Sequence, residues 1–240
     1  MDYEVELLPG RDQTEESIRV RHPGGSSEQF RLHEYTRVYA VPGLYEEVVQ
    51  ERLKCASPRV LAELLLSGVA SVRRPPAEVA VFDLGAGNGV MGEALRERGV
   101  RTLVASDNIA EARDAALRDR PGLYSEYLVG DTDDLSAVAG LIREHGLNTL
   151  VAAGALGLGH ISAQSFHRLW SRFPAGAWFA VTLHVDLAQP GGSDFGDYLA
   201  GFEDRDDGGD IVLRTRFRHR LTMAGEPIIY MAIIARKRPG

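Results

Sequence analysis

Residues 79–92 read VAVFDLGAGNGVMG, and this stretch decides the fold of the chain. Its first part, from Val79 to Leu84, is an apolar run too short for a helix and rich in β-branched and aromatic residues, which predicts a buried strand. The glycines at positions 85, 87 and 89 allow a tight turn and let a ligand approach the main chain where a Cβ atom would collide. A helix that begins after the turn directs unpaired N–H groups and a positive dipole end toward it. The stretch therefore predicts a nucleotide-type binding site.

Two interpretations of these glycines compete. A dinucleotide site needs Gly-x-Gly-x-x-Gly directly after the strand. Counted from Gly85, the sixth position is Val90, so this frame fails; counted from Gly87, the pattern fits but begins late relative to the strand end. Asp83 precedes the first glycine by two positions, and a carboxylate there is electrostatically wrong for a pyrophosphate. It suits a nucleotide that carries a cationic amino-acid group.

Two further apolar runs also end in an acid. Residues 102–107 end in Asp107 and residues 126–131 end in Asp131, and each run reads as a strand. A carboxylate at the position of Asp107 is placed to accept hydrogen bonds from both ribose hydroxyls, as in other nucleotide-binding βαβ units. The alternative is that these acids only cap helices or turns. Three strands that each end in an acid are a more specific signal than the glycines alone.

The pattern Asp-x-Gly-x-Gly-x-Gly at residues 83–89 resembles motif I of class I S-adenosylmethionine-dependent methyltransferases. The phrases YAVPGLY at 39–45 and GALGLGHI at 154–161 look like those of the Williams–Beuren syndrome region methyltransferase-like family and its bacterial relatives. The resemblance covers about residues 35–238 and implies S-adenosylmethionine as cofactor. It also implies that the third acid, Asp131, meets the adenine amino group and that the next backbone N–H meets the ring. The cofactor-binding residues expected on these grounds are Tyr35, Tyr39, Asp83, Gly85, Ala86, Gly87, Asp107, Asn108, Asp131, Thr132, Ala153 and Gly154.

Strand and helix patterns alternate from residue 79 onward. Strands are expected at 79–84, 102–107, 126–131, 147–154 and 177–184, and helices at about 89–98, 109–118, 134–145 and 161–172. Such alternation implies a parallel sheet with helices on both faces. Strands at 210–217 and 227–235, joined by a short turn, must be antiparallel. We therefore expect an α/β, Rossmann-like seven-stranded methyltransferase sheet of order 3-2-1-4-5-7-6, with strand 7 antiparallel.

The first third of the chain has a different pattern. Residues 1–34 are expected to form an N-terminal arm or hairpin, with a short strand at 17–21, and residues 35–240 the methyltransferase domain. Residues 35–70 are expected to form a helical lid, with two helices between 35 and 66. Aromatic rings of Tyr35 and Tyr39 in this lid suit the sulfonium through cation–π attraction, whereas for Tyr45 we favour packing against the core.

The loop after the fourth strand, at residues 153–160, is expected beside the glycine turn. Methyl transfer depends mainly on holding donor and acceptor in near-attack geometry, and a general base is needed only if the acceptor keeps its proton. His160 is the first candidate for this base and His184, near Asp186, the second. The alternative is that each histidine caps a helix or packs a loop. The glycine-rich residues 189–198 suggest a mobile substrate gate.

Length and composition limit the possible partners. A chain of 240 residues fits one domain with a substantial core, and its net charge of −7 argues against nucleic acid as substrate. The basic run RTRFRHR at 214–220 is interpreted as a solvated strand face. The single cysteine, Cys55, excludes internal disulfides and cysteine-based zinc sites and is consistent with a cytoplasmic location. No apolar run is long enough to span a bilayer, so no membrane partner is expected.

These observations favour metal-independent methyl transfer to an oxygen, nitrogen or carbon atom of a small-molecule acceptor. Metal is not expected because Asn148 lies at the wrong end of the fourth strand for a catechol-type site. The Asn/Asp-Pro-Pro-Tyr signature is absent after that strand, where AGAL stands at 153–156, which argues against nucleic acid and protein amides. The alternatives are a non-catalytic cofactor-binding protein and, less favoured, a nicotinamide dehydrogenase. A monomer and a homodimer both remain open.

Overall fold

The computed structural model describes residues 3–130, 135–157 and 161–238. Within them a seven-stranded sheet has the order β6-β5-β4-β7-β8-β10-β9. The strands β4 to β8 pair in parallel, and β10 is antiparallel to both β8 and β9. This confirms the expected order 3-2-1-4-5-7-6 with its seventh strand antiparallel. The strands are β4 (Ala80–Leu84), β5 (Thr102–Asp107), β6 (Glu126–Val129), β7 (Thr149–Ala152), β8 (Trp178–His184), β9 (Gly209–Leu221) and β10 (Pro227–Lys237).

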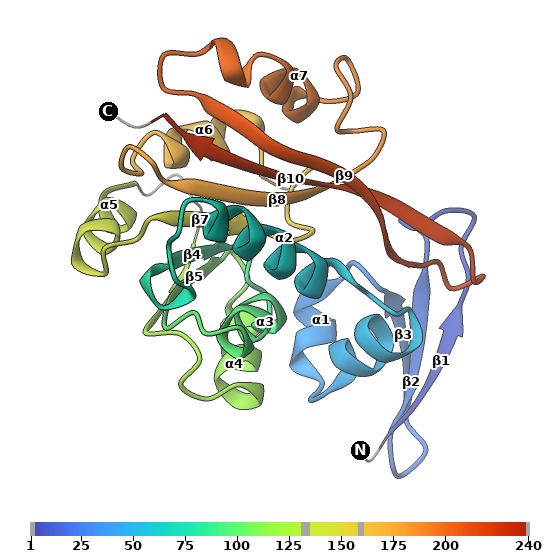
Figure 1. The fold of residues 1–240 in the computed structure, drawn as a ribbon. Helices are drawn as coiled ribbons and strands as arrows, with labels where there is room; N and C mark the ends of the chain where they lie inside the picture. Colours follow the sequence, from blue (N-terminus) through green and yellow to red (C-terminus); the bar gives the residue numbers. More distant parts are fainter. Residues whose placement is uncertain (1–2, 131–134, 158–160, 239–240) are drawn as a thin grey trace.

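Helices cover both faces of the sheet (Figure 1). Every residue of β4 is buried, as expected for a central parallel strand that has apolar neighbours on both sides. One core contains Phe82, Phe166 and Phe195, and the opposite core contains Val81, Leu65 and Leu95. The first face carries α5 (Leu135–Glu144), α6 (Ala163–Trp170) and α7 (Asp194–Ala200); the second carries α2 (Ser57–Ser71) and α3 (Val90–Glu97), with α4 (Ala110–Asp119) beside α3.

The N-terminal residues form more than a hairpin. Three strands, β1 (Glu4–Leu8), β2 (Ser17–Arg21) and β3 (Ser27–Arg31), make an antiparallel sheet in sequential order. Its apolar face packs on the next helical segments, so Ile18, Val20 and Phe30 share a core with Val38 and Val48. The alternation of Ser17–Arg21 predicted one of these strands. The domain boundary expected at residue 35 stays a prediction.

The lid region differs in detail from its expected pair of helices. It contains α1 (Tyr35–Ala40), the π-helix η1 (Glu46–Arg52) and α2, which begins at Ser57 and continues beyond the expected end to Ser71. A second difference concerns residues 189–198, interpreted as a mobile glycine-rich gate. Their second half belongs to α7, where the Ser193 side chain caps the helix by accepting from the Gly196 amide. Short 3-10 turns lie at η2 (Pro76–Glu78) and η3 (Phe202–Asp204).

The β9–β10 hairpin extends past the parallel strands and reaches the N-terminal sheet (Figure 1). Its turn end is tied to the lid region by backbone hydrogen bonds from Ala56 N to His219 O and from Leu221 N to Leu53 O, both 2.7 Å. In the basic run on β9, Arg214, Arg216 and Arg218 are exposed, as a solvated strand face predicts. Arg220 is buried, so that interpretation is wrong for the end of the run. In the described part of the chain, no helix combines the length and apolarity needed to cross a membrane.

Candidate functional site

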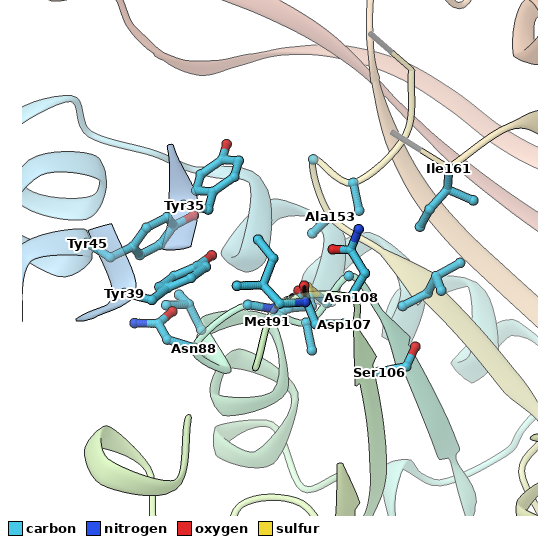
Figure 2. A pocket seen from close by; sticks show the side chains of 18 of the residues that line it. Tyr35, Tyr39, Tyr45, Asn88, Met91, Ser106, Asp107, Asn108, Ala153 and Ile161 are labelled. Carbon is cyan, nitrogen blue, oxygen red and sulfur yellow. Dashed lines mark hydrogen bonds between the residues drawn. The ribbon is translucent and has the colours of Figure 1, made fainter. Parts of the chain in front are cut away.

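A cavity of about 430 Å³ lies at the carboxyl ends of the central strands (Figure 2). It is located where β4 pairs with β5 on one side and β7 on the other, which is the switch point at which open α/β sheets bind ligands. Nine of the expected cofactor-binding residues line it. They are Tyr35, Tyr39, Gly85, Ala86, Gly87, Asp107, Asn108, Ala153 and Gly154.

The glycine turn between β4 and α3 has the backbone conformation that its sequence requires. Gly85 and Gly87 have φ of +68° and +56°, in the left-handed region that other residues rarely adopt. A Cβ atom on Gly85 would lie 2.4 Å from the Cβ of Ala155, so there is no room for a side chain. The Tyr127 hydroxyl donates to Gly87 O at 2.6 Å and fixes the turn from below. The turn thus presents main-chain groups to the cavity.

Asp107 lies at the tip of β5, as the sequence predicted. Its two carboxylate oxygens accept hydrogen bonds from the backbone amides of Gly87, at 2.9 Å, and Ile109, at 3.1 Å. A carboxylate offers about four acceptor positions, which suits a group that receives several hydrogen-bond donors at once. Asp107 therefore connects the glycine turn to the loop after β5 and leaves a negative charge at the cavity wall (Figure 2).

Asp83 occupies a different place from the one that its sequence position suggested. It is 1% exposed, does not line the cavity, and accepts a hydrogen bond from the Tyr124 hydroxyl at 2.6 Å. Burial raises the pKa of this carboxyl to about 7, with a contribution from the negative charge of Asp107. Because the side chain lies beneath the glycine turn, it supports the turn and does not contact the space above it.

Three tyrosines form one wall of the cavity (Figure 2). The rings of Tyr35 and Tyr39 are stacked with centroids 5.8 Å apart, and Tyr39 meets Tyr45 at 5.2 Å. The sequence predicted the first two, but Tyr45 lines the cavity as well as packing against the core. This wall comes from the lid region and faces the glycine turn.

Charged contacts hold the lid onto the turn. Glu46 at the start of η1 accepts hydrogen bonds from the side chains of Asn88 and Arg120. Arg120 also donates to the main-chain oxygen of Asn88 at 3.1 Å and pairs with Glu93. Both the lid and α3 are therefore linked through one guanidinium group, a contact that no sequence motif indicated.

A second cavity, of about 400 Å³, adjoins the first. The two share five lining residues: Tyr35, Tyr45, Pro58, Ala153 and Gly154. The second cavity is also lined by His33, Cys55, Ser57, His219 and Tyr230. Sequence reasoning missed His219, which it counted only as part of a basic run. The alternation of exposed and less exposed residues along the strand could have indicated it. His219 falls on the less exposed face of β9 with Leu213, Thr215 and Phe217.

The two histidines predicted as candidate bases and the last two predicted cofactor residues remain to be placed. His184 lines neither cavity; its ring lies edge-on to Tyr230 at 5.7 Å, and its Nδ1 is 3.7 Å from a carboxylate oxygen of Asp186. His160, Asp131 and Thr132 lie outside the described residues. Gly130, which directly precedes the latter two, lines the first cavity.

Cys55 and Asn148, which the sequence analysis considered for thiol and metal chemistry, both have packing or backbone contacts. The Cys55 sulfur is 3.9 Å from Nδ1 of His219, but burial raises the pKa of the thiol. No group of three or more histidine, cysteine or acidic side chains is placed to hold a metal ion in that part of the chain. Asn148 instead has a structural role, because its side chain bonds to the backbone of Ala80 and Glu78.

No protein-family model and no curated protein matches the chain. Solved structures do. The 1,6-didemethyltoxoflavin-N1-methyltransferase of Burkholderia thailandensis, with 1,6-didemethyltoxoflavin and S-adenosylhomocysteine bound, is 17% identical at a TM-score of 0.55, covering 98% of this chain and 99% of its own. The N-methyltransferase NodS of Bradyrhizobium japonicum, with S-adenosylhomocysteine, is 12% identical at 0.56, covering 85% and 96%. A probable spermidine synthase of Corynebacterium glutamicum is 14% identical at 0.51, covering 98% and 77%.

These similarities define the class of fold. The chain has the Rossmann-like fold of class I S-adenosylmethionine-dependent methyltransferases, with the complete seven-stranded sheet in the expected order. Since the identities are below 20%, they concern the fold alone. The resemblance to the Williams–Beuren group stays a prediction.

Proposed function

We propose that this protein transfers the methyl group of S-adenosylmethionine to a small-molecule acceptor. The observation that carries the proposal is the carboxylate of Asp107. Two backbone amides fix it at the tip of β5, beside a glycine turn at the switch point of the sheet. A negative group so placed suits the two hydroxyls of a ribose. The methyltransferases of similar fold were solved with S-adenosylhomocysteine, which supports the same choice of cofactor here.

The residues around the cavity fit the parts of this cofactor. Asp107 would hold the ribose, and Asn108 and Gly130, with the predicted Asp131 and Thr132, would surround the adenine. The main chain of Gly85 to Gly87 would receive the amino-acid end. Tyrosine faces attract cations, so the lid suits the sulfonium. When bound, the cofactor supplies a methyl group on a positively charged sulfur.

The residues of this chain contribute mainly by placement. The glycine turn and Asp107 fix the donor, and the tyrosine wall keeps water from it, which is the condition for a near-attack geometry. Asp83 acts from beneath, by holding the turn through Tyr124. A histidine that accepts the acceptor's proton, His160 or His184, remains a proposal for acceptors that keep their proton until attack.

Isothermal titration calorimetry tests the cofactor directly. We expect S-adenosylhomocysteine to bind and NAD to show no heat of binding under the same conditions. Tight binding of NAD, or no binding of S-adenosylhomocysteine, would reject the proposal.

Turnover then separates catalysis from binding. We expect S-adenosylhomocysteine to accumulate when the protein and S-adenosylmethionine are incubated with a panel of metabolites. A protein that binds the cofactor but never releases this product with any acceptor would be a cofactor-binding protein. A different group transfer is the other possibility to examine, since a probable spermidine synthase shares the fold.

A further inference from the structure

Five aromatic rings line the second cavity, beside polar and aliphatic side chains. They belong to Tyr35, Tyr45, Tyr230, His33 and His219. It adjoins the first cavity along Ala153 and Gly154 and shares Tyr35 and Tyr45 with it. These two tyrosines belong to the wall proposed to face the sulfonium, so the methyl group would lie near the boundary of the two cavities. Flat side chains around a volume of about 400 Å³ favour a flat, apolar ligand, because ring faces pack best on other ring faces.

One polar group in this cavity is held in a fixed orientation. Nδ1 of His219 is 2.6 Å from Oγ of Ser57, and the imidazole is stacked on Tyr230 with centroids 4.0 Å apart and planes 18° apart. The other ring nitrogen, Nε2, makes no hydrogen bond with the residues that the structure describes. The ring edge faces the shared wall, since a Cβ on Gly154 would lie 4.0 Å from Cε1 of His219.

The imidazole is neutral at physiological pH. Burial lowers the pKa of His219 to about 3, and the positive charge of Arg220 adds to this effect. A neutral imidazole has one donor and one acceptor nitrogen. When Nδ1–H donates to Ser57, Nε2 is left as an acceptor for a ligand.

The cavity has no uncompensated charge in its interior. Among the described lining residues, the acidic and basic side chains are Arg31, Glu34 and Arg220. Arg31 and Glu34 are exposed, and Arg220 is buried in an ion pair with Glu16 at 2.7 Å. A charged ligand buried in the interior would therefore lose its hydration, and Arg220, the buried cation among the described lining residues, is already paired.

We propose that the second cavity is the acceptor site and binds an uncharged planar aromatic molecule whose N–H or O–H group donates to Nε2 of His219. This inference rests on the proposed function, since it places the acceptor beside the methyl donor. His219 is then a positioning residue: it turns the nucleophilic atom toward the shared wall. Ser57 and Tyr230 keep its ring in place.

Three matched probes test this chemistry: naphthol, methoxynaphthalene and naphthoate. They share one ring system and differ in carrying a neutral donor, no donor or a negative charge. Their dissociation constants are measured by calorimetry with S-adenosylhomocysteine at saturation, which keeps them out of the first cavity. We expect naphthol to bind about tenfold more tightly than methoxynaphthalene, the scale of one hydrogen bond, and naphthoate to bind most weakly.

The ratio between naphthol and methoxynaphthalene is the decisive readout in variants. His219→Phe keeps a ring for stacking on Tyr230 but removes both nitrogens, so we expect the ratio to fall to about one. Ser57→Ala, which releases Nδ1 and leaves the stack, should lower it partly. His22→Phe is the control: His22 directly follows β2, lines neither cavity, and its substitution should keep the ratio of the unaltered protein. A general loss of packing would weaken both probes equally and leave the ratio unchanged.

Three results would overturn the inference: a ratio that survives His219→Phe, naphthoate binding as tightly as naphthol, or no binding of any probe at millimolar concentration. Failure of the proposed function is recognised separately. If S-adenosylhomocysteine does not bind, the cofactor assignment is wrong, while the dependence of the ratio on His219, measured without it, still decides the chemistry of the second cavity.

Discussion

The two adjoining cavities are built from different parts of the chain. The first is lined by turns that directly follow β4, β5 and β7, with the tyrosine wall added. The second joins residues 31–35 and 55–58 to His219 and Tyr230, which are more than 160 positions away from Ser57. The proposed cofactor side thus uses local motifs on a parallel sheet, whereas the proposed acceptor side depends on how the N-terminal sheet docks on the last hairpin. Cofactor binding and acceptor binding should therefore respond to different substitutions.

The contact that ties the second region together is the buried pair of Glu16 and Arg220. They are 1% and 4% exposed, 2.7 Å apart, and Glu16 also accepts from the backbone amide of Met223. Removing one partner of a buried pair leaves an uncompensated charge. We predict that Glu16→Ala lowers the free energy of unfolding by about 3–5 kcal/mol, measured by chemical denaturation.

Glu6 offers a matched control for this experiment. It pairs with Arg19 at the same distance of 2.7 Å, but both side chains are more than one-third exposed, at 44% and 35%. Glu6→Ala should cost less than about 1 kcal/mol. Similar losses for Glu6→Ala and Glu16→Ala would show that burial does not increase the contribution of the Glu16–Arg220 pair to stability. The ratio of naphthol to methoxynaphthalene binding should change more in Glu16→Ala than the affinity for S-adenosylhomocysteine.

The corresponding residue on the first side is Asp107. Asp107→Ala removes the acceptor for the Gly87 and Ile109 amides and the charge proposed to receive the ribose. We predict a loss of about 1–3 kcal/mol in S-adenosylhomocysteine affinity, the scale for charge-assisted hydrogen bonds, measured by calorimetry. Asp114→Ala on the exposed side of α4 is the control and should bind as the unaltered protein does. An unchanged dissociation constant in Asp107→Ala would remove this residue from the site.

The first cavity is built from local motifs and the second from long-range contacts, and this difference explains how much of each the sequence could predict. Strand, glycine turn and helix follow one another within residues 79–97, so local patterns sufficed to predict the sheet order and most of the first cavity. Asp83 shows the limit of that reasoning. Its position in the motif was clear, but only the packing of Tyr124 reveals that the carboxylate lies beneath the turn.

The second cavity could not be predicted because its contacts are long-range. No periodicity in residues 1–34 shows that Glu16 meets Arg220, which is 204 positions later in the chain. The basic run on β9 was interpreted from its charge alone. The alternation of the strand places His219 on the less exposed face, with Leu213 and Phe217, and this would have indicated a buried histidine. The helix α7 was missed because three glycines in residues 189–198 suggested a loop, although Gly196 is required there: its Cβ would lie 2.0 Å from Gln189 O.

Asp83 also makes a prediction about pH. Its carboxyl has a pKa of about 7 in the folded protein, against about 4 in an unfolded chain, so between these values the folded state keeps a proton that the unfolded state has lost. Stability should therefore fall as pH rises through this window, by up to about 1.4 kcal/mol per pH unit. Asp83→Asn removes this contribution. The free energy of unfolding of Asp83→Asn, relative to that of the unaltered protein, should therefore increase as pH rises from 4 to 7. A constant difference would contradict the raised pKa.

The smallest expected effect concerns the boundary between the two regions, where Glu46 fastens the lid to the glycine turn. Glu46→Gln keeps the shape of the side chain but removes the charge that pairs with Arg120, whose side chain is 10% exposed against 26% for Glu46. Because the pair is partly solvated, we predict a local loss of about 0.5–1 kcal/mol, seen as faster amide hydrogen exchange in Glu46–Arg52. Glu51→Gln on the exposed face of the same helix should leave exchange unchanged. If both variants exchange equally, the lid is held by its apolar contacts, and the second cavity does not depend on the charge of Glu46.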